Sequence, residues 1–336
     1  MLPNKLEIVA ELSGNHNGSK QNLLDLVTAA EDSGATCIKI QCFTPDTITA
    51  NSSQDWFKVT DGPWAGSTLF ELYSETYLPW EWYDELFSHA DRLGIEIFGS
   101  VFDEKSADFL SQFNSEKVKI ASPEIIDLKL IDYASRLFER VIVSTGMSSK
   151  KEVFEAATVV KEKRKYLTLL QCVSEYPAKP ESYNLQGLKY LSTFSNSYGI
   201  SDHSLADTAS IGAVALGATL IEKHFTLNRS EGGIDSHFSL EPIEFLALSQ
   251  KVNDVFQACA VKDYEEMNSD FDNQKYRRSL FYSSDIAQGT LITEKHIKCI
   301  RPGVGLHPSN ENLLIGKKLK YDVETNQPID YCHFQN

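Results

Sequence analysis

The chain has 336 residues, 42% hydrophobic and 24% charged, which suffices for one large α/β domain and a small appendage. Its formal net charge of -15 argues against a nucleic-acid partner, because phosphate binding relies on clustered lysine and arginine. Charged residues interrupt the apolar N-terminus, so we expect no secretory signal, and the longest apolar stretch, 211–221, is too short to span a bilayer.

The six cysteines are Cys37, Cys42, Cys172, Cys259, Cys299 and Cys332. They form neither a C-x-x-C motif nor a dense framework, so we expect reduced thiols in a cytoplasmic protein.

Short apolar runs rich in β-forming residues alternate with helical segments along most of the chain. The runs are 6–12, 37–42, 95–102, 118–121, 141–144, 167–172, 198–201 and 220–225, and helical spacing is clear at 22–33, 80–93, 150–161 and 206–217. Gly34, Gly94 and Gly217 stand where these helices would end. Eight such repeats predict a parallel TIM (β/α)8 barrel. An open doubly wound sheet is the alternative, but no G-x-G-x-x-G follows the first run.

Two segments depart from this alternation. Residues 44–79 are long, aromatic and rich in turn formers, which indicates an insertion in the loop after the second strand. The chain becomes polar and acidic further on, so we predict a barrel domain over 1–261, a linker over 262–277 and a small β-rich domain over 278–336, with strands at 279–284 and 297–300.

Two lysines are predicted to point into the barrel. Lys39 and Gln41 alternate with isoleucines in the second strand, and Lys119 alternates with apolar residues in the fourth. Buried ammonium groups need partners, so the pattern indicates an anionic ligand or compensating carboxylates such as Glu11 and Glu124. The alternative is a structural ion pair inside the barrel.

Two histidines follow neighbouring strands. His203 comes after the seventh and His224 ends the eighth, so their side chains can converge on a divalent metal. Water or substrate oxygens would complete the coordination of such a two-ligand site. The alternative is that each is a hydrogen-bonded wall residue.

Further polar residues stand at strand ends and in the tail. Serine hydroxyls there can hold phosphate or carboxylate oxygens, although serine also serves as a cap; these are Ser100, Ser122, Ser144 and Ser201. In the tail, Arg301 precedes a proline-glycine turn and is either a ligand-binding or a surface residue.

These motifs together resemble the sialic acid synthase family over nearly the whole chain. The matching stretches are AELSGNHNG (10–18), IKIQ (38–41), KIASPE (119–124), VSTGM (143–147), ISDHS (200–204) and EKHFTL (222–227), followed by an antifreeze-like (β-clip) tail with IRPG at 300–303. Segments 41–49, 62–82 and 229–242 are similar to the branch of the family that makes pseudaminic acid.

The resemblance implies a role for each matching residue. Phosphoenolpyruvate would be held by Lys39, Lys119 and the serines at 100, 122, 144 and 201, with Ser174 at a position where many relatives have asparagine. A divalent metal (Mn, Mg or Co) would bind His203 and His224. Residues around the sugar would be Glu11, Gln41, Glu124, Tyr176 and Asp235, and Arg301 would come from the partner subunit of a domain-swapped homodimer.

The resemblance also implies a reaction. C3 of phosphoenolpyruvate would attack the open-chain aldehyde of 2,4-diacetamido-2,4,6-trideoxy-L-altrose, and water would add at C2 before phosphate leaves with C–O cleavage. Trp80, Trp82 and Phe238 are candidate sugar contacts. The alternatives are a neuraminate or legionaminate synthase using an N-acetylmannosamine-like sugar, a metal-dependent pyruvate aldolase and a non-enzymatic sugar-binding protein.

Overall fold

The computed structural model describes residues 5–60, 65–260 and 271–335. It separates into two compact units, Met1–Ala260 and Val261–Asn336, which are described separately. Residues 262–270 of the predicted linker lie outside the described residues, so the predicted domain boundaries remain predictions. In the described part of the chain, no helix combines the length and apolarity needed to cross a membrane.

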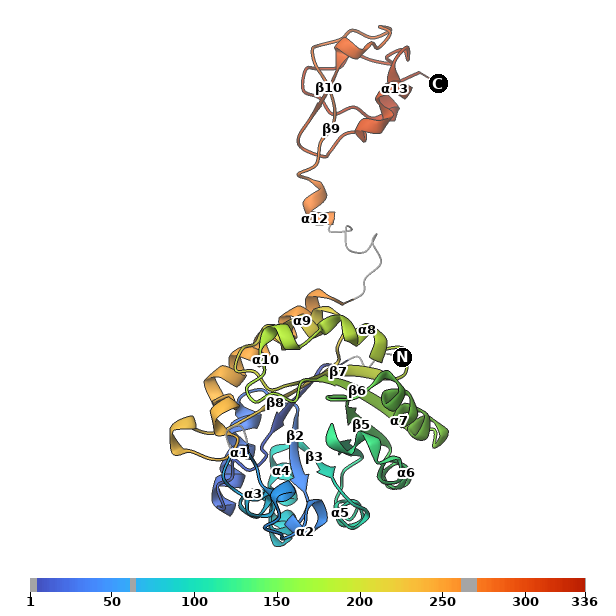
Figure 1. Cartoon of the computed structure of the whole chain (residues 1–336). Helices are drawn as coiled ribbons and strands as arrows, with labels where there is room; N and C mark the ends of the chain where they lie inside the picture. Colours follow the sequence, from blue (N-terminus) through green and yellow to red (C-terminus); the bar gives the residue numbers. More distant parts are fainter. Residues whose placement is uncertain (1–4, 61–64, 261–270, 336) are drawn as a thin grey trace. The chain divides into compact units, whose positions relative to one another are not determined.

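The first unit is a closed barrel of eight parallel strands, as predicted (Figure 1). Each strand begins and ends within one residue of its predicted position, because short apolar runs are recognisable locally. The strands are β1 (Glu7–Glu11), β2 (Cys37–Cys42), β3 (Glu96–Val101), β4 (Lys117–Ile120), β5 (Arg140–Ser144), β6 (Tyr166–Cys172), β7 (Ser197–Asp202) and β8 (Leu220–His224).

Helices surround the barrel and bury its apolar outer surface (Figure 1). Glycine ends α4 in the left-handed region, with φ 74° at Gly94, as its position in the sequence predicted. The helices are α1 (Lys20–Asp32), α4 (Tyr83–Leu93), α5 (Glu104–Leu110), α6 (Leu128–Leu137), α7 (Lys150–Glu162), α8 (Leu188–Leu191), α9 (Thr208–Ala215) and α10 (Pro242–Ala258). Short 3-10 turns lie at Pro123–Ile126, Pro180–Ser182, Leu185–Gly187, Arg229–Glu231 and Ser236–Phe238.

The inside of the barrel is layered, because every second residue of a strand points inward. Polar and charged side chains at the strand starts form a layer that we call the base: Glu7, Cys37, Glu96, Lys117, Arg140, Thr168 and Ser197. The middle layer is apolar and contains Val9, Phe98, Ile142, Leu170 and Leu220. Polar side chains at the strand ends form a third layer, which we call the mouth: Glu11, Lys39, Ser100, Lys119, Ser144, Ser201, Glu222 and His224.

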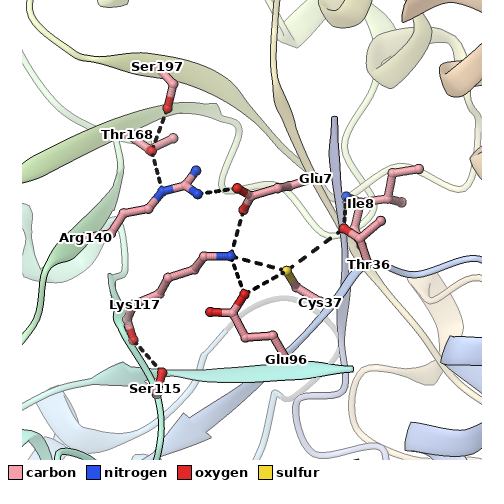
Figure 2. A network of polar contacts seen from close by, with 10 residues as sticks. All are labelled: Glu7, Ile8, Thr36, Cys37, Glu96, Ser115, Lys117, Arg140, Thr168 and Ser197. Carbon is pink, nitrogen blue, oxygen red and sulfur yellow. Dashed lines mark hydrogen bonds and ion pairs between the residues drawn. The ribbon is translucent and has the colours of Figure 1, made fainter. Parts of the chain in front are cut away.

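The base is an ion-pair network (Figure 2). Lys117 Nζ lies 3.1 Å from Glu7 Oε2 and 2.6 Å from Glu96 Oε2, and it also approaches Cys37 Sγ at 3.4 Å. Arg140 pairs with Glu7 and donates from Nε to Thr168 Oγ1 at 3.1 Å. These contacts join six strands, β1 to β6, at the end of the barrel that in this fold serves stability.

The insertion after β2 folds over the mouth side of the barrel. It contains α2 (Pro45–Ile48), a 3-10 turn at Asp55–Phe57, α3 (Leu69–Thr76) and a 3-10 turn at Trp80–Trp82. The start of α3 is set by a capping box, in which Thr68 Oγ1 accepts from Glu71 N and Glu71 Oε2 accepts from Thr68 N.

The second unit is a small β-rich domain, as predicted. Its strands β9 (Ser279–Tyr282) and β10 (Ile297–Ile300) are antiparallel, and they pack in a core that includes Leu280, Ile292, Leu314 and Leu319. Short helices complete it: α12 (Phe271–Gln274), α13 (Glu311–Leu314) and 3-10 turns at Glu294–His296, Pro308–Asn310 and Tyr331–His333.

Candidate active site

A cavity of about 290 Å³ opens at the mouth of the barrel. Most of the residues singled out in the sequence line it: Lys39, Gln41, Ser100, Lys119, Ser122, Glu124, Ser144, Tyr176, Ser201, His203, His224 and Asp235. Glu11 is fully buried beside Lys39. Ser174 does not line the cavity; a Cβ at Gly146 would lie 2.7 Å from Ser174 Oγ and 2.8 Å from Ser122 Oγ, so Gly146 separates Ser174 from a lining residue. Arg301 is exposed in the second unit.

The floor of the cavity holds two lysines on one carboxylate. Lys39 Nζ and Lys119 Nζ both lie 3.0 Å from Glu222 Oε1, and Lys119 is also 3.0 Å from Oε2. Lys39 makes a second ion pair, at 2.8 Å, with Glu11. The strand register produces this cluster, because Glu11 stands opposite Lys39 on one side and His224 on the other.

Burial and charge set the protonation states of the floor. Burial would raise the pKa of Glu222, but Lys119 and Lys39 outweigh it and lower that pKa, so Glu222 is ionised. Burial would lower the pKa of Lys39, but Glu11 and Glu222 raise it. Burial raises the pKa of Glu11 to about 7 despite Lys39. Two ammonium groups therefore share one firmly ionised carboxylate, which leaves the floor ready for an anion.

Three buried polar atoms of the cavity wall lack a hydrogen-bond partner within the protein: Glu124 Oε2, Ser144 Oγ and His224 Nδ1. A buried polar atom without a partner costs about 1–3 kcal/mol. Atoms that line a cavity and remain unpaired are suited to meet a ligand there. Ser201, in contrast, already donates to Glu222 Oε1 at 2.9 Å.

The two histidines stand together above the floor, with ring centroids 5.3 Å apart. His203 Nδ1 lies 2.7 Å from the Val173 carbonyl oxygen, so it carries the proton, and Nε2, 3.5 Å from Ser201 Oγ, is an acceptor. Burial lowers the pKa of His203 to about 4 and also lowers the pKa of His224, so both rings are neutral. Phe238 packs against His224 at 4.7 Å and Tyr176 against His203 at 4.4 Å.

This donor set fits a divalent metal. Two neutral imidazoles, one with a buried unpartnered nitrogen, are suited to bind a metal. Within the described residues, no group of three or more His, Cys, Asp or Glu side chains is placed to hold a metal. Water or substrate oxygens would have to complete the shell of an ion held there.

Ser13, in the β1–α1 loop, connects Gln41 of β2 to Asp235 of the loop after β8. Ser13 donates to Asp235, and Gln41 Nε2 donates to Ser13 Oγ at 3.2 Å. Gln41 also reaches Glu11 Oε1 at 3.4 Å. Burial raises the pKa of Asp235, so this chain of polar contacts includes a carboxyl that ionises less readily than usual.

Sequence reasoning missed the central place of Glu222. The residues alternate as Ile221, Glu222, Lys223 and His224, and the argument that turned Lys39 inward also turns Glu222 and His224 inward. Lys223 points the other way and is nevertheless buried, because its Nζ pairs with Asp202 Oδ2 at 2.9 Å.

A second missed group positions His203. Tyr183 OH donates to Asp202 Oδ1 at 2.5 Å and accepts from the His203 backbone N–H at 3.0 Å. The buried Asp202 therefore orients, through Tyr183, the backbone that carries one of the two histidines. No local pattern signals this contact, because Tyr183 lies 20 residues before His203.

The chain is similar to known proteins along nearly its full length. It is 38% identical over 333 residues to pseudaminic acid synthase of Campylobacter jejuni subsp. jejuni serotype O:2, covering 98% of this chain and 97% of that protein. It is 36% identical to pseudaminic acid synthase of Helicobacter pylori, covering 96% of each. It is 31% identical to N,N'-diacetyllegionaminic acid synthase of Legionella pneumophila, covering 98% and 94%.

A solved structure and two family matches agree with these relatives. The N-acetylneuraminic acid (sialic acid) synthetase of Leptospira borgpetersenii, solved in complex with citrate, superposes with a TM-score of 0.71 at 27% identity, covering 80% of this chain and 92% of that one. Residues 26–264 match the NeuB family, and residues 277–335 match the SAF domain. The chain therefore belongs to the NeuB family and carries a SAF domain at its C-terminal end.

Proposed function

We propose that this protein is a pseudaminic acid synthase, which condenses phosphoenolpyruvate with 2,4-diacetamido-2,4,6-trideoxy-L-altrose to give pseudaminic acid and phosphate. The observation that carries the proposal is the pair Lys39 and Lys119 on one carboxylate beneath two neutral histidines. The similarity to two pseudaminic acid synthases at 36% and 38% identity supports this choice over a neuraminate or legionaminate synthase.

The floor residues hold the anionic substrate. Lys39 and Lys119 bind the phosphate and carboxylate of phosphoenolpyruvate, and Ser144 donates its unpartnered hydroxyl to the same oxygens. The serines at 100, 122 and 201 line the same floor, and Ser174 stands behind it. Because these donors are fixed before the substrate arrives, charge in the transition state is stabilised without rearrangement.

The upper residues handle the sugar and the protons. Gln41, Tyr176 and Asp235 position the open-chain aldehyde, while Glu11 and Glu124 move protons. Burial raises the pKa of both Glu11 and Glu124 to about 7, which lets them give or take a proton near neutral pH. His203 and His224 would hold a divalent cation (Mn, Mg or Co), which supplies Lewis-acid polarisation of an oxygen when bound.

The proposal is tested by measuring phosphate release from phosphoenolpyruvate with a panel of amino sugars. The panel contains 2,4-diacetamido-2,4,6-trideoxy-L-altrose, N-acetylmannosamine and a legionaminic-type diacetamido sugar. We expect the altrose derivative to give the highest kcat/KM. Equal or better turnover of N-acetylmannosamine would contradict the proposal, and turnover of pyruvate without phosphate release would favour an aldolase.

We also propose a domain-swapped homodimer in the cytoplasm. Arg301, exposed in the second unit, would complete the partner subunit's active site, and all six cysteines are unpaired, as a reducing compartment requires. Mixing inactive Lys39→Ala and Arg301→Ala proteins tests the exchange. Random pairing would restore about a quarter of wild-type activity, because half the dimers are hybrids with one intact site. No recovery after verified subunit exchange rules the swap out.

A further inference from the structure

One wall of the cavity is apolar, unlike its charged floor. Ile48 from α2, Leu72 from α3 and Phe102 from the loop after β3 all line the cavity, and each is half-buried. They lie on the β2–β3 side of the barrel, whereas the histidines come from β7 and β8. An apolar surface of this kind inside an otherwise polar site is suited to an apolar part of the substrate.

The candidate aromatic residues from the sequence do not form this wall. Trp80 stacks on Phe109 with centroids 4.1 Å apart, and Trp82 packs edge-on against His16 at 5.8 Å. Neither tryptophan lines the cavity, so both pack as loop-core residues here, and their contact with the sugar stays a prediction. Phe238 is fully buried behind the histidines.

Phe102 and α3, which carries Leu72, both pack on other parts of the barrel domain. Phe43 is fully buried and packs edge-on against both Phe102, at 5.4 Å, and Tyr73 of α3, at 5.8 Å. At the end of α3, the Thr76 carbonyl oxygen lies 3.3 Å from His16 Nε2. A Cβ on Gly14 would lie 2.7 Å from Thr76 Cγ2, so α3 packs closely on the β1–α1 loop. Side chains fixed in this way can discriminate between substrates by shape.

The chemistry of the reaction places the two ends of the sugar. The aldehyde carbon, C1, must meet phosphoenolpyruvate at the lysine floor, so C6 at the other end of the open chain lies away from the floor. The insertion supplies two of the three apolar residues there. We propose that Ile48, Leu72 and Phe102 contact the C6 methyl group of the sugar and select 6-deoxy over 6-hydroxy amino sugars. This inference rests on the proposed function.

The test compares two sugars that differ by one hydroxyl: 2,4-diacetamido-2,4,6-trideoxy-L-altrose and its 6-hydroxy counterpart. A hydrophobic pocket discriminates against an added hydroxyl only moderately, so we expect wild-type kcat/KM to favour the 6-deoxy sugar by about 10- to 100-fold. Leu72→Asn keeps the side-chain size and removes the apolar surface. We expect it to bring the preference to within about threefold, chiefly through slower use of the 6-deoxy sugar.

Two further variants keep the test decisive. Leu69→Asn makes the same change in α3 at a residue that does not line the cavity, and it should retain the wild-type preference. Ile48→Thr repeats the test on α2 should Leu72→Asn fail to fold. The KM for phosphoenolpyruvate should stay unchanged in all three variants.

The outcomes separate the inference from the function on which it rests. A wild-type protein that uses neither sugar overturns the proposed function and the inference together. A wild-type protein that uses both sugars equally well, or Leu72→Asn and Ile48→Thr variants that keep the full preference, overturns the inference alone.

Discussion

The two ends of the barrel contain similar charges arranged for different purposes. The base has two carboxylates and two cations, Glu7, Glu96, Lys117 and Arg140, and the mouth has Glu11, Glu222, Lys39 and Lys119. In the base, Glu96 is 36% exposed, and Lys117 and Arg140 share Glu7. In the mouth, two lysines share Glu222, and their side chains are at most 7% exposed.

The difference lies in what remains unpaired. At the mouth, three cavity-lining residues have a buried polar atom without a partner, namely Glu124 Oε2, Ser144 Oγ and His224 Nδ1. Within the described residues of the base, only Arg140 Nη2 is such an atom. A closed set of ion pairs stabilises a fold, while an incomplete set in a cavity recruits a ligand. Experiments that treat the two ends in parallel can separate these roles.

Removal of the metal should give the largest difference between the mouth and the base. A chelator should abolish turnover, and Mn²⁺, Mg²⁺ or Co²⁺ should restore it, because His203 and His224 would hold the ion at the mouth alone. His203→Ala should likewise remove most turnover while circular dichroism reports a folded protein. Full activity in a preparation verified as metal-free would contradict the metal site.

The next comparison uses two lysines of the same strand. Lys117 and Lys119 lie two residues apart in β4, one in the base and one in the mouth. Lys119→Met should lower kcat/KM by about 10²–10³-fold, because it removes a charge from the anion site. Lys117→Met should leave kcat/KM close to wild type and lower the free energy of unfolding by about 1–3 kcal/mol. Equal activity losses in both variants would show that the two ends do not differ in role.

Glu124→Gln should change the pH dependence of stability. Burial raises the pKa of Glu124 to about 7 in the folded protein, whereas its ordinary pKa is 4.5. Between these pH values the folded protein therefore keeps a proton that the unfolded chain has lost. Ionising Glu124 therefore costs stability, a cost that grows as pH rises from 4.5 to 7 and is complete above 7. We expect urea unfolding to give the difference in free energy of unfolding, variant minus wild type, at both pH values. This difference should be about 1–3 kcal/mol larger at pH 8 than at pH 5. An identical difference at both pH values would refute the raised pKa.

The smallest effect is expected from single hydroxyls. Ser144→Ala should raise the KM for phosphoenolpyruvate about tenfold with no loss of stability, because its Oγ has no partner within the protein. Thr168→Val in the base removes an acceptor for Arg140 and should cost about 1 kcal/mol of stability without changing that KM. The assay is steady-state kinetics beside urea unfolding.

The sequence allowed the strands and the inward lysines to be predicted, because alternation within a strand is a local property. The same rule applied to β8 would have found Glu222, which sits between the two lysines. Lys223 shows the limit of the rule, since it points to the apolar side and is paired there by Asp202.

Contacts between distant segments could not be predicted in this way. The base joins Glu7 to Lys117 and Arg140, which lie more than 100 residues along the chain, so only the register of the closed barrel brings them together. The insertion was recognised by length and composition, but its position over the mouth depends on Gly14 and His16 meeting Thr76. For that reason the sequence could not show that Trp80 and Trp82 pack outside the cavity lining.

The apolar middle layer has a practical consequence for protein engineering. Phe98, Ile142 and Leu170, with Val9 and Leu220, form an apolar cluster between the two charged layers of the described barrel. A buried ion network can often be replaced by apolar side chains of similar volume with equal or better stability. The base is therefore a region where charged residues can be replaced to stabilise this enzyme. Such substitutions should leave the residues at the mouth unchanged.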